Sequence, residues 1–306
     1  MSAVIDIDDL TVVFDRGLRR AGQKALDRVS LQVGEGDAFA LIGPNGAGKS
    51  TMLYCLLGLL APTSGSARVF GQVLEPGSSL FRDIAFVPED PHYHDYLTVE
   101  EGVRYYAALQ GDRLSAERLT SVLEQLQLET VRTTRLSACS KGMKQKVGIA
   151  RCLLRPPRLL VLDEPMRGLD AVTVKQFRDV LIDLNRRGAT IVMNSHQLSE
   201  VEQVATHVAI LSKGQLLAVK PLSELTRVEQ HVYSVEVDHL GELPDYLTVD
   251  RLHDGRVRGT VPAQRLFEFM DLARIRGADV HSCVIKKHTL EDSFLATLSE
   301  SERAHV

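Results

Sequence analysis

The chain of 306 residues is 44% apolar and 25% charged, the balance of an ordinary folded protein, which excludes a disordered or collagen-like chain. Its formal net charge of −4 gives no general attraction to nucleic acid. The longest apolar stretch, Met52 to Ala61, has roughly ten residues, about half of what a membrane-crossing helix needs. We therefore expect a folded chain of two domains that does not itself span a membrane.

The N-terminal sequence and the cysteines indicate a cytoplasmic protein. The segment MSAVIDIDD has acidic residues where a secretory signal needs basic ones. The four cysteines lie far apart without a CxxC pair, so neither a disulfide framework nor a zinc site is predicted. We expect free thiols, mostly buried, at Cys55, Cys139, Cys152 and Cys283.

Residues 1–220 alternate short apolar runs with helical periods, which predicts an α/β domain with a parallel sheet. The predicted strands are Ala38 to Ile42, Leu159 to Leu162, Thr190 to Met193 and Val208 to Leu211. Between the first two strands, Thr98 and Glu101 match a capping box that opens a helix, so a helical insertion is expected at about residues 90–157. A second capping box, Ser199 with Glu202, predicts another helix.

Beyond Pro221 the pattern changes, and residues 221–306 are predicted to form a small α+β accessory domain. Its expected elements are strands at Tyr233 to Val237, Arg256 to Val261 and Ala278 to Ile285, a helix at Ala263 to Arg276 and a final helix from near Thr289.

The segment GPNGAGKS matches the G-x-x-x-x-G-K-[ST] pattern of a phosphate-binding loop, and it follows a predicted strand and opens a helix. Such a loop wraps a phosphate chain with its backbone N–H groups, and the helix N-terminus favours negative charge. A chance glycine-rich turn is the weaker alternative. The residues expected to bind phosphate are Gly43, Pro44, Asn45, Gly46, Ala47, Gly48, Lys49, Ser50 and Thr51.

Five further segments follow the same order as in a known family. They are Phe14, IAFVPED, SKGMKQK, LLVLDEP with its GLD continuation, and NSH. With the phosphate loop, they make residues 1–220 similar to the nucleotide-binding subunits of ABC transporters. The resemblance implies the P-loop NTPase fold, with a parallel sheet core, an antiparallel β edge and a helical insertion. It also implies ATP and Mg²⁺ as cofactors.

The same resemblance assigns roles in ATP hydrolysis. Lys49 reaches the β- and γ-phosphates, and Glu164 orients and polarises the attacking water. His196 senses the γ-phosphate, although a lone histidine is more often a surface or core residue. Oxygen ligands for magnesium are expected from Ser50, Asp163 and Glu89.

Phe14 stands where the family has an aromatic ring that stacks on adenine, although it could also be an inward-facing strand residue. The signature segment is expected to bind a nucleotide held by the opposite subunit, with Ser140 as the N-cap of a helix. Its departures from the usual LSGGQ are Cys139, Lys141 and Met143, and Glu89 replaces the usual glutamine. The remaining expected nucleotide-binding residues are Ser140, Lys141, Gly142, Met143 and Asp170.

These features predict an ATP-hydrolysing subunit that pairs head to tail with a second copy and drives a separate polytopic membrane permease. The variants at Glu89, Lys141 and Met143 are similar to those of bacterial exporters, so export is expected from the cytoplasmic face of the inner membrane. Tyr93 and Tyr96 could engage that partner, or they could pack within the domain. No nucleic-acid partner is expected. The alternatives are an ABC-type ATPase that acts on nucleic acid or ribosomes, and a regulatory protein with an inactive site.

Overall fold

The computed structural model describes residues 3–14, 22–109, 111, 114–238, 240–253 and 255–304. The chain divides into two compact units. The first runs to Leu222 and resumes at Thr297, and the second comprises Ser223–Ala296. The assignment of residues 221–306 to a separate accessory domain stays a prediction.

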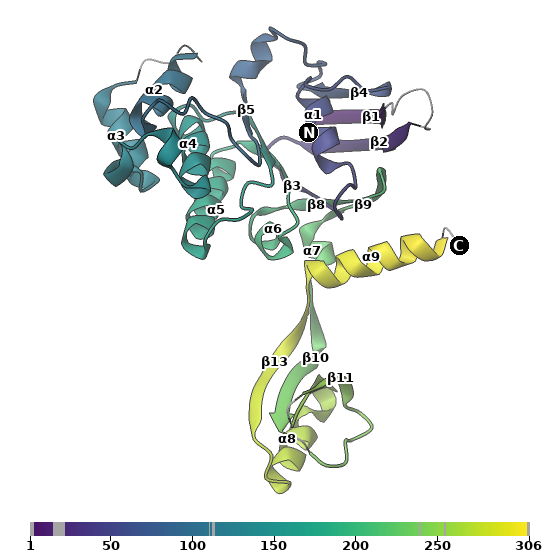
Figure 1. The fold of residues 1–306 in the computed structure, drawn as a ribbon. Helices are drawn as coiled ribbons and strands as arrows, with labels where there is room; N and C mark the ends of the chain where they lie inside the picture. Colours follow the sequence, from purple (N-terminus) through teal and green to yellow (C-terminus); the bar gives the residue numbers. More distant parts are fainter. Residues whose placement is uncertain are drawn as a thin grey trace. The chain divides into compact units, whose positions relative to one another are not determined.

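A six-stranded sheet forms the centre of the first unit, in the order β5-β6-β7-β3-β8-β9 (Figure 1). The neighbouring strands are parallel except for β9, which pairs antiparallel with β8. All four strands predicted for this sheet are present, and every residue of β3, β6 and β7 is buried, as continuous apolar runs require. The strands are β3 (Ala38–Ile42), β5 (Ile84–Val87), β6 (Leu159–Asp163), β7 (Thr190–Asn194), β8 (His207–Ser212) and β9 (Gln215–Pro221).

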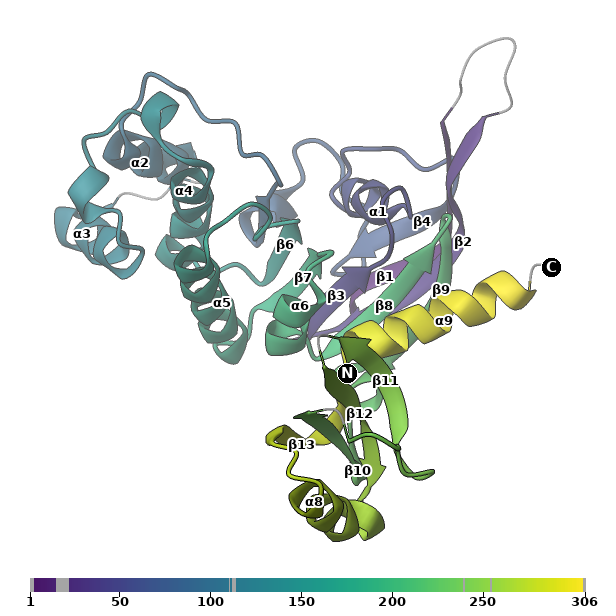
Figure 2. The same cartoon turned by 60° about the horizontal axis from the view of Figure 1, so that its bottom comes forward.

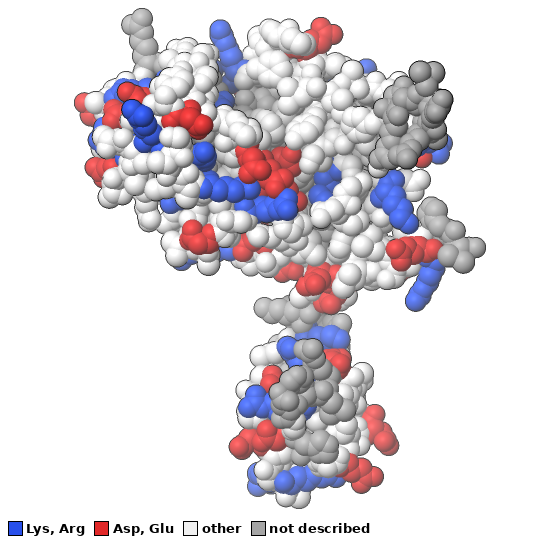
Figure 3. Space-filling model, in the orientation of Figure 1, with Lys and Arg blue, Asp and Glu red and all other residues white. Residues whose placement is uncertain are grey.

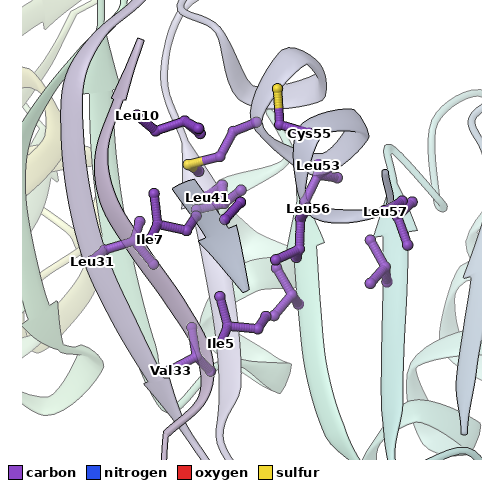
Figure 4. Packing of buried hydrophobic residues seen from close by; sticks show 14 of the residues in the cluster. Ile5, Ile7, Leu10, Leu31, Val33, Leu41, Leu53, Cys55, Leu56 and Leu57 are labelled. Carbon is purple, nitrogen blue, oxygen red and sulfur yellow. The ribbon is translucent and has the colours of Figure 1, made fainter. Parts of the chain in front are cut away.

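An antiparallel sheet, in the order β2-β1-β4, forms the β edge that the resemblance implied. Its strands are β1 (Ala3–Phe14), β2 (Gln23–Gly34) and β4 (Ser64–Val69). Helix α1 (Lys49–Leu56) packs in the same core. Figure 4 shows side chains of β1 and β2 pointing toward Leu41 of β3 and toward Leu53 and Leu56 of α1. This packing holds the start of α1 against the sheet edge.

A helical insertion was predicted between β3 and β6, and the structure has one there, between β5 and β6. Its helices lie together on the side away from the antiparallel sheet (Figure 2). It contains α2 (Val99–Leu109), α3 (Ala116–Gln125) and α4 (Lys141–Leu154), with short 3₁₀ turns η2 (Glu129–Val131) and η3 (Leu136–Ala138). The capping box at the start of α2 is formed. The Thr98 N–H donates to Glu101 Oε2 at 2.9 Å, and the Glu101 N–H donates to Thr98 Oγ1 at 3.3 Å.

The second predicted capping box is wrong. Helix α6 (Leu198–Val204) has Gln197 at its N-cap, without a side-chain capping bond. The Gln197 N–H donates instead to Ser195 Oγ at 3.0 Å, in a turn that directs the chain into the helix before Ser199. The other helical elements of this unit are α5 (Ala171–Arg186) and the 3₁₀ turn η1 (Ser79–Arg82).

The second unit, Ser223–Ala296, has the α+β composition that was expected of the C-terminal part of the chain. Its antiparallel sheet has the order β11-β12-β10-β13, with a core that includes Val235, Val257 and Phe269. Strand β11 was not predicted. The elements of the remaining chain are α7 (Leu222–Leu225), β10 (Arg227–Asp238), β11 (Thr248–His253), β12 (Arg256–Pro262), η4 (Ala263–Arg265), α8 (Leu266–Ile275), β13 (Val280–His288) and α9 (Leu290–Ala304).

Within the described ranges, no helix has the length and apolar character needed to cross a bilayer. The four cysteines are free thiols, as predicted, and three of them are buried.

Candidate functional site

The loop between β3 and α1 needs glycine at two positions. At Gly48, the N-cap of α1, φ is +104°, and a Cβ atom would lie 2.4 Å from the carbonyl oxygen of Ala25. At Gly43, a Cβ atom would lie 2.2 Å from the carbonyl oxygen of Leu211. The loop backbone therefore packs directly against two other strands, and the N-terminus of α1 is left facing a pocket.

Lys49 lies buried at the start of α1, with 7% of its surface exposed. Its ammonium group donates to the carbonyl oxygens of Gly43 at 2.6 Å and Pro44 at 3.2 Å. Burial lowers the pKa of Lys49, and the carboxylates of Glu164 and Asp163 oppose this shift. The ammonium group is thus hydrogen-bonded to the phosphate loop and interacts electrostatically with Glu164 and Asp163.

The loop forms one wall of a pocket of about 370 Å³. Residues of β1 and β2 and of the segments after β5 and β6 complete it. The lining residues are Phe14, Gln23, Ala25, Asn45, Gly46, Ala47, Gly48, Lys49, Ser50, Thr51, Glu89, Glu164 and Arg167. Most of the residues expected to bind phosphate therefore share one pocket with Phe14, Glu89 and Glu164.

Asp163, at the end of β6, is the centre of a buried hydrogen-bond network. Its Oδ1 accepts from Ser50 Oγ at 3.0 Å and from Asn194 Nδ2 at 2.6 Å. Its Oδ2 accepts from the Tyr54 hydroxyl at 3.1 Å. Burial and the Asp163 carboxylate raise the pKa of Tyr54, so this phenol remains a donor. Asp163 does not itself line the pocket, but this bond holds it next to Ser50, which does.

Glu164 follows Asp163 in a left-handed conformation, with φ of +45°, which is unusual for a residue with a side chain. Its N–H donates to Asn194 Oδ1 at 2.6 Å. The Glu164 carboxylate accepts from the His196 N–H at 3.3 Å, and its Oε2 lies 2.6 Å from His196 Nδ1. This contact favours the tautomer that carries a proton on Nδ1. Asn194 of β7 therefore links two adjacent carboxylate residues, and His196 orients the second.

Phe14 lines the pocket with 44% of its surface exposed, so its ring is not an inward-facing core residue. Glu89, which also lines the pocket, accepts a hydrogen bond from the Arg167 guanidinium at 2.6 Å. The backbone around Glu89 is held by Gln145 of α4, whose Nε2 donates to the carbonyl oxygens of Pro88 at 3.1 Å and Glu89 at 2.8 Å.

The signature residues lie at the N-terminus of α4 and do not line the pocket. Ser140 caps the helix, accepting from the Met143 N–H at 3.3 Å, and the Ser140 N–H points back to Met143 Sδ at 3.4 Å. Methionine thus preserves the reciprocal capping geometry. Lys141 forms an ion pair with Asp90 at 2.9 Å, and this contact lowers the pKa of the Asp90 carboxyl group. Gly142 occupies the second helical position of α4.

Asp170 also lies outside the pocket lining, as the N-cap of α5. Its carboxylate accepts from the N–H groups of Val172 at 3.1 Å and Thr173 at 3.0 Å. These bonds lower the pKa of Asp170.

Sequence reasoning missed the contributions of Asn194, Tyr54, Gln145 and Arg167. Asn194 precedes His196 by two residues at the end of a predicted parallel strand, and this position is a usable signal because such strand ends meet at one sheet edge. The other three residues carry no local signal, because their partners are at least about 50 residues away and are brought close only by the fold.

The fold and the pocket define a P-loop nucleoside triphosphatase, with phosphate-binding backbone, lysine and acidic residues at one sheet edge. The family model of the ABC transporters matches residues 26–167. An ABC transporter ATP-binding protein of Nostoc is 32% identical over 98% of this chain and 91% of its own length. The bacitracin transport ATP-binding protein of Bacillus licheniformis is 32% identical over 96% of this chain and 97% of its own length.

A solved structure of the same family is also similar to this chain. A dimeric ATP-binding cassette, in a post-hydrolysis state with ADP and Pi, is 26% identical with a TM-score of 0.65 and covers 72% of this chain and 99% of its own. This chain belongs to the ATP-binding proteins of the ABC transporter family. It is an ATP-binding and ATP-hydrolysing subunit, of a kind that forms dimers and works with membrane permeases.

Proposed function

We propose that this chain powers export by a separate polytopic permease, from the cytoplasmic face of the inner membrane, as a head-to-tail dimer. The observation that carries the proposal is the pocket in which the phosphate loop meets Glu164 and its partner His196. The relatives named for bacitracin transport, in Bacillus licheniformis and Enterococcus faecalis, support a transport role of this kind. The net charge of −4 favours no nucleic-acid partner.

The oxygen atoms at and next to the pocket wall fit magnesium. Ser50 Oγ and Asp163 Oδ1 lie 3.0 Å apart, and Glu89 provides a further carboxylate on the pocket wall. No group of three His, Cys, Asp or Glu side chains in the described part of the chain could hold a metal ion alone. This suits an ion that is shared with phosphate oxygens, as Mg²⁺ usually is. When bound, Mg²⁺ neutralises charge that develops on the phosphates.

Glu164 is proposed to orient the attacking water. Glu164 lines the pocket, and 9% of the residue is exposed. Contacts with His196 fix its carboxylate. A carboxylate held by neighbours while facing a phosphate site can accept a hydrogen bond from water and polarise it. His196 does not line the pocket, but it contacts Glu164, which does, and 44% of its side chain is exposed. It is proposed to respond to the γ-phosphate.

The head-to-tail arrangement is supported by expected nucleotide-binding residues that lie outside the pocket. Ser140, Lys141, Gly142 and Met143 form the N-terminus of α4 but do not line the pocket of their own chain. A helix N-terminus presents N–H groups suited to a phosphate. In a head-to-tail pair, each α4 N-terminus and each Asp170 would face the nucleotide of the other chain, and two ATP molecules would lie at the interface. ATP would then favour closure, and hydrolysis would remove that preference.

A tagged copy extracted from membranes in detergent tests the transport role. We expect it to bring down a polytopic membrane protein in stoichiometric amount, and Lys49→Ala should retain that partner while losing ATP-dependent release of cargo. Recovery of ribosomes or nucleic acid in place of a membrane protein would contradict the proposal. Because export moves cargo out of the cell, inverted membrane vesicles that contain this chain and its permease should accumulate cargo when ATP is added.

The two tyrosines of the segment 91–98 are expected to behave differently. The ring of Tyr93 lies 5.4 Å from that of Tyr106, and the Tyr93 hydroxyl lies close to Gly148 of α4. Tyr96 is 69% exposed and is proposed to contact the permease. Tyr93→Ala should therefore lower the free energy of unfolding by about 2–4 kcal/mol. Tyr96→Ala should leave stability and soluble ATPase activity unchanged while lowering transport.

Thermal unfolding, soluble ATPase activity and vesicle transport together measure this difference. Phe267→Ala, at an aromatic residue that is 82% exposed on α8, is the matched control and should change none of the three. Equal loss of ATPase activity and transport in Tyr96→Ala would show that this ring is structural.

A further inference from the structure

The segment Pro88–Asp90, directly after β5, carries two acidic side chains that each have a basic partner from another element. Arg167, in the loop after β6, contacts Glu89 at 2.6 Å, and Lys141 of α4 contacts Asp90 at 2.9 Å. Figure 3 shows acidic side chains bordered directly by basic ones on the surface of the first unit. The negative charge that Glu89 introduces in place of a neutral glutamine is therefore paired with a positive charge.

The two ion pairs differ in one respect that concerns the nucleotide. Glu89 and Arg167 both line the pocket of the phosphate loop, whereas Asp90 and Lys141 do not. The side chain of Glu89 is 33% exposed and that of Arg167 is 54% exposed, so both face the pocket and its solvent. A carboxylate at this wall repels the phosphates of a nucleotide unless a cation is placed beside it.

Lys49 does not supply that cation. Its ammonium group is buried and donates to the loop carbonyls of Gly43 and Pro44, and its charge is balanced against Glu164 and Asp163. Among the described residues that line the pocket, Arg167 is the other basic one. The guanidinium keeps its charge under all conditions at which the protein is folded.

We propose that Arg167 is a positioning residue for nucleotide binding, which holds the Glu89 carboxylate at the pocket wall and neutralises it. The guanidinium lets ATP enter beside Glu89 before magnesium contributes its charge. This inference rests on the proposed roles of the phosphate loop and Glu89 in ATP binding. It assigns to Arg167 an effect that acts through Glu89, and not a direct contact with the phosphates.

ATP affinity measured with and without magnesium tests this assignment. The variants are Arg167→Ala, Glu89→Gln and the double variant, titrated with a fluorescent ATP analogue in EDTA and then in excess Mg²⁺. Arg167→Ala should weaken Mg²⁺-free binding by about 5- to 10-fold, because an unpaired carboxylate then faces the phosphates. In the Glu89→Gln background, the same change should weaken binding by less than about twofold.

Two further readouts distinguish an electrostatic effect from a structural one. The loss in Arg167→Ala should shrink in excess Mg²⁺ and at about 1 M salt, where the charges are screened. Asp90→Asn, which removes a carboxylate of the same segment outside the pocket, is the matched control and should keep Mg²⁺-free affinity within about twofold. Thermal unfolding should show that all variants are folded.

Unchanged Mg²⁺-free affinity in Arg167→Ala would overturn the proposal, as would an equal loss with glutamate or glutamine at position 89. The equal loss would mean that Arg167 touches the phosphates itself. Failure of the proposed ATP site is a separate result, because the wild-type chain would then bind no ATP under either condition, and Lys49→Ala would change nothing.

Discussion

Glu164→Gln is expected to bind ATP as the wild-type chain does but to hydrolyse it at least about 100-fold more slowly. The amide has the shape of the carboxylate, so the pocket and the contact with His196 can persist, but it cannot accept a proton from water. The Glu164 backbone N–H is bonded to Asn194, which keeps the residue in its left-handed conformation in the variant. ATP should then remain bound at the interface and hold two chains together.

Phosphate release measures turnover, and size-exclusion chromatography with ATP and magnesium measures the dimer. We expect a stable dimer for Glu164→Gln that is absent without ATP. Glu129→Gln, at an exposed glutamate of the insertion, is the matched control and should behave as the wild type does. A wild-type rate of hydrolysis in Glu164→Gln would show that another group orients the water.

Asn194→Ala should lower both stability and turnover. The Asn194 side chain is completely buried, accepts from the Glu164 N–H, and donates to Asp163 Oδ1 and to Ser50 Oγ at 3.3 Å. Its removal leaves a cavity and unpaired buried groups, which should cost about 2–4 kcal/mol of unfolding free energy. With Asp163 and Glu164 no longer held relative to each other, turnover should fall by at least about tenfold.

Asn185→Ala separates the two effects. Asn185 also makes two side-chain hydrogen bonds, both partly buried, to the carbonyl oxygens of Gly36 and Ala189, but it lies in α5 outside the pocket. Chemical denaturation should show destabilisation in both variants, whereas ATPase activity well below the unfolding transition should fall only in Asn194→Ala. If the two variants lost activity equally, Asn194 would have no role beyond folding.

The helical insertion and the parallel sheet could be predicted because their signals are local. Continuous apolar runs predict buried strands, and the Thr98–Glu101 pair marks a helix start that depends on residues three positions apart. The capping box predicted at Ser199 was wrong because it, too, was inferred from local spacing alone. A capping pattern competes with neighbouring turn chemistry, and the Ser195 hydroxyl group directed the chain into α6 earlier. Strand β11 was missed because it gave no strong alternation.

By itself, the sequence determined the class of chemistry. The phosphate loop, the adjacent Asp163 and Glu164, and His196 are contiguous motifs, so their residue types and order can be read without a structure. The sequence also showed that Glu89, Lys141 and Met143 depart from the usual family pattern. It could not show what compensates for these departures.

Only the tertiary structure decided that. Arg167 beside Glu89 and Asn194 between Asp163 and Glu164 are pairings between residues about 30 to 80 positions apart. Lys141 pairs with Asp90, and Met143 closes the cap of α4 on Ser140. Such partners meet because parallel strands bring their carboxyl ends to one edge of the sheet, and because the insertion returns α4 to the segment after β5. Local spacing identifies the catalytic and binding side chains, whereas the fold brings up the neighbours that orient these side chains and neutralise their charge.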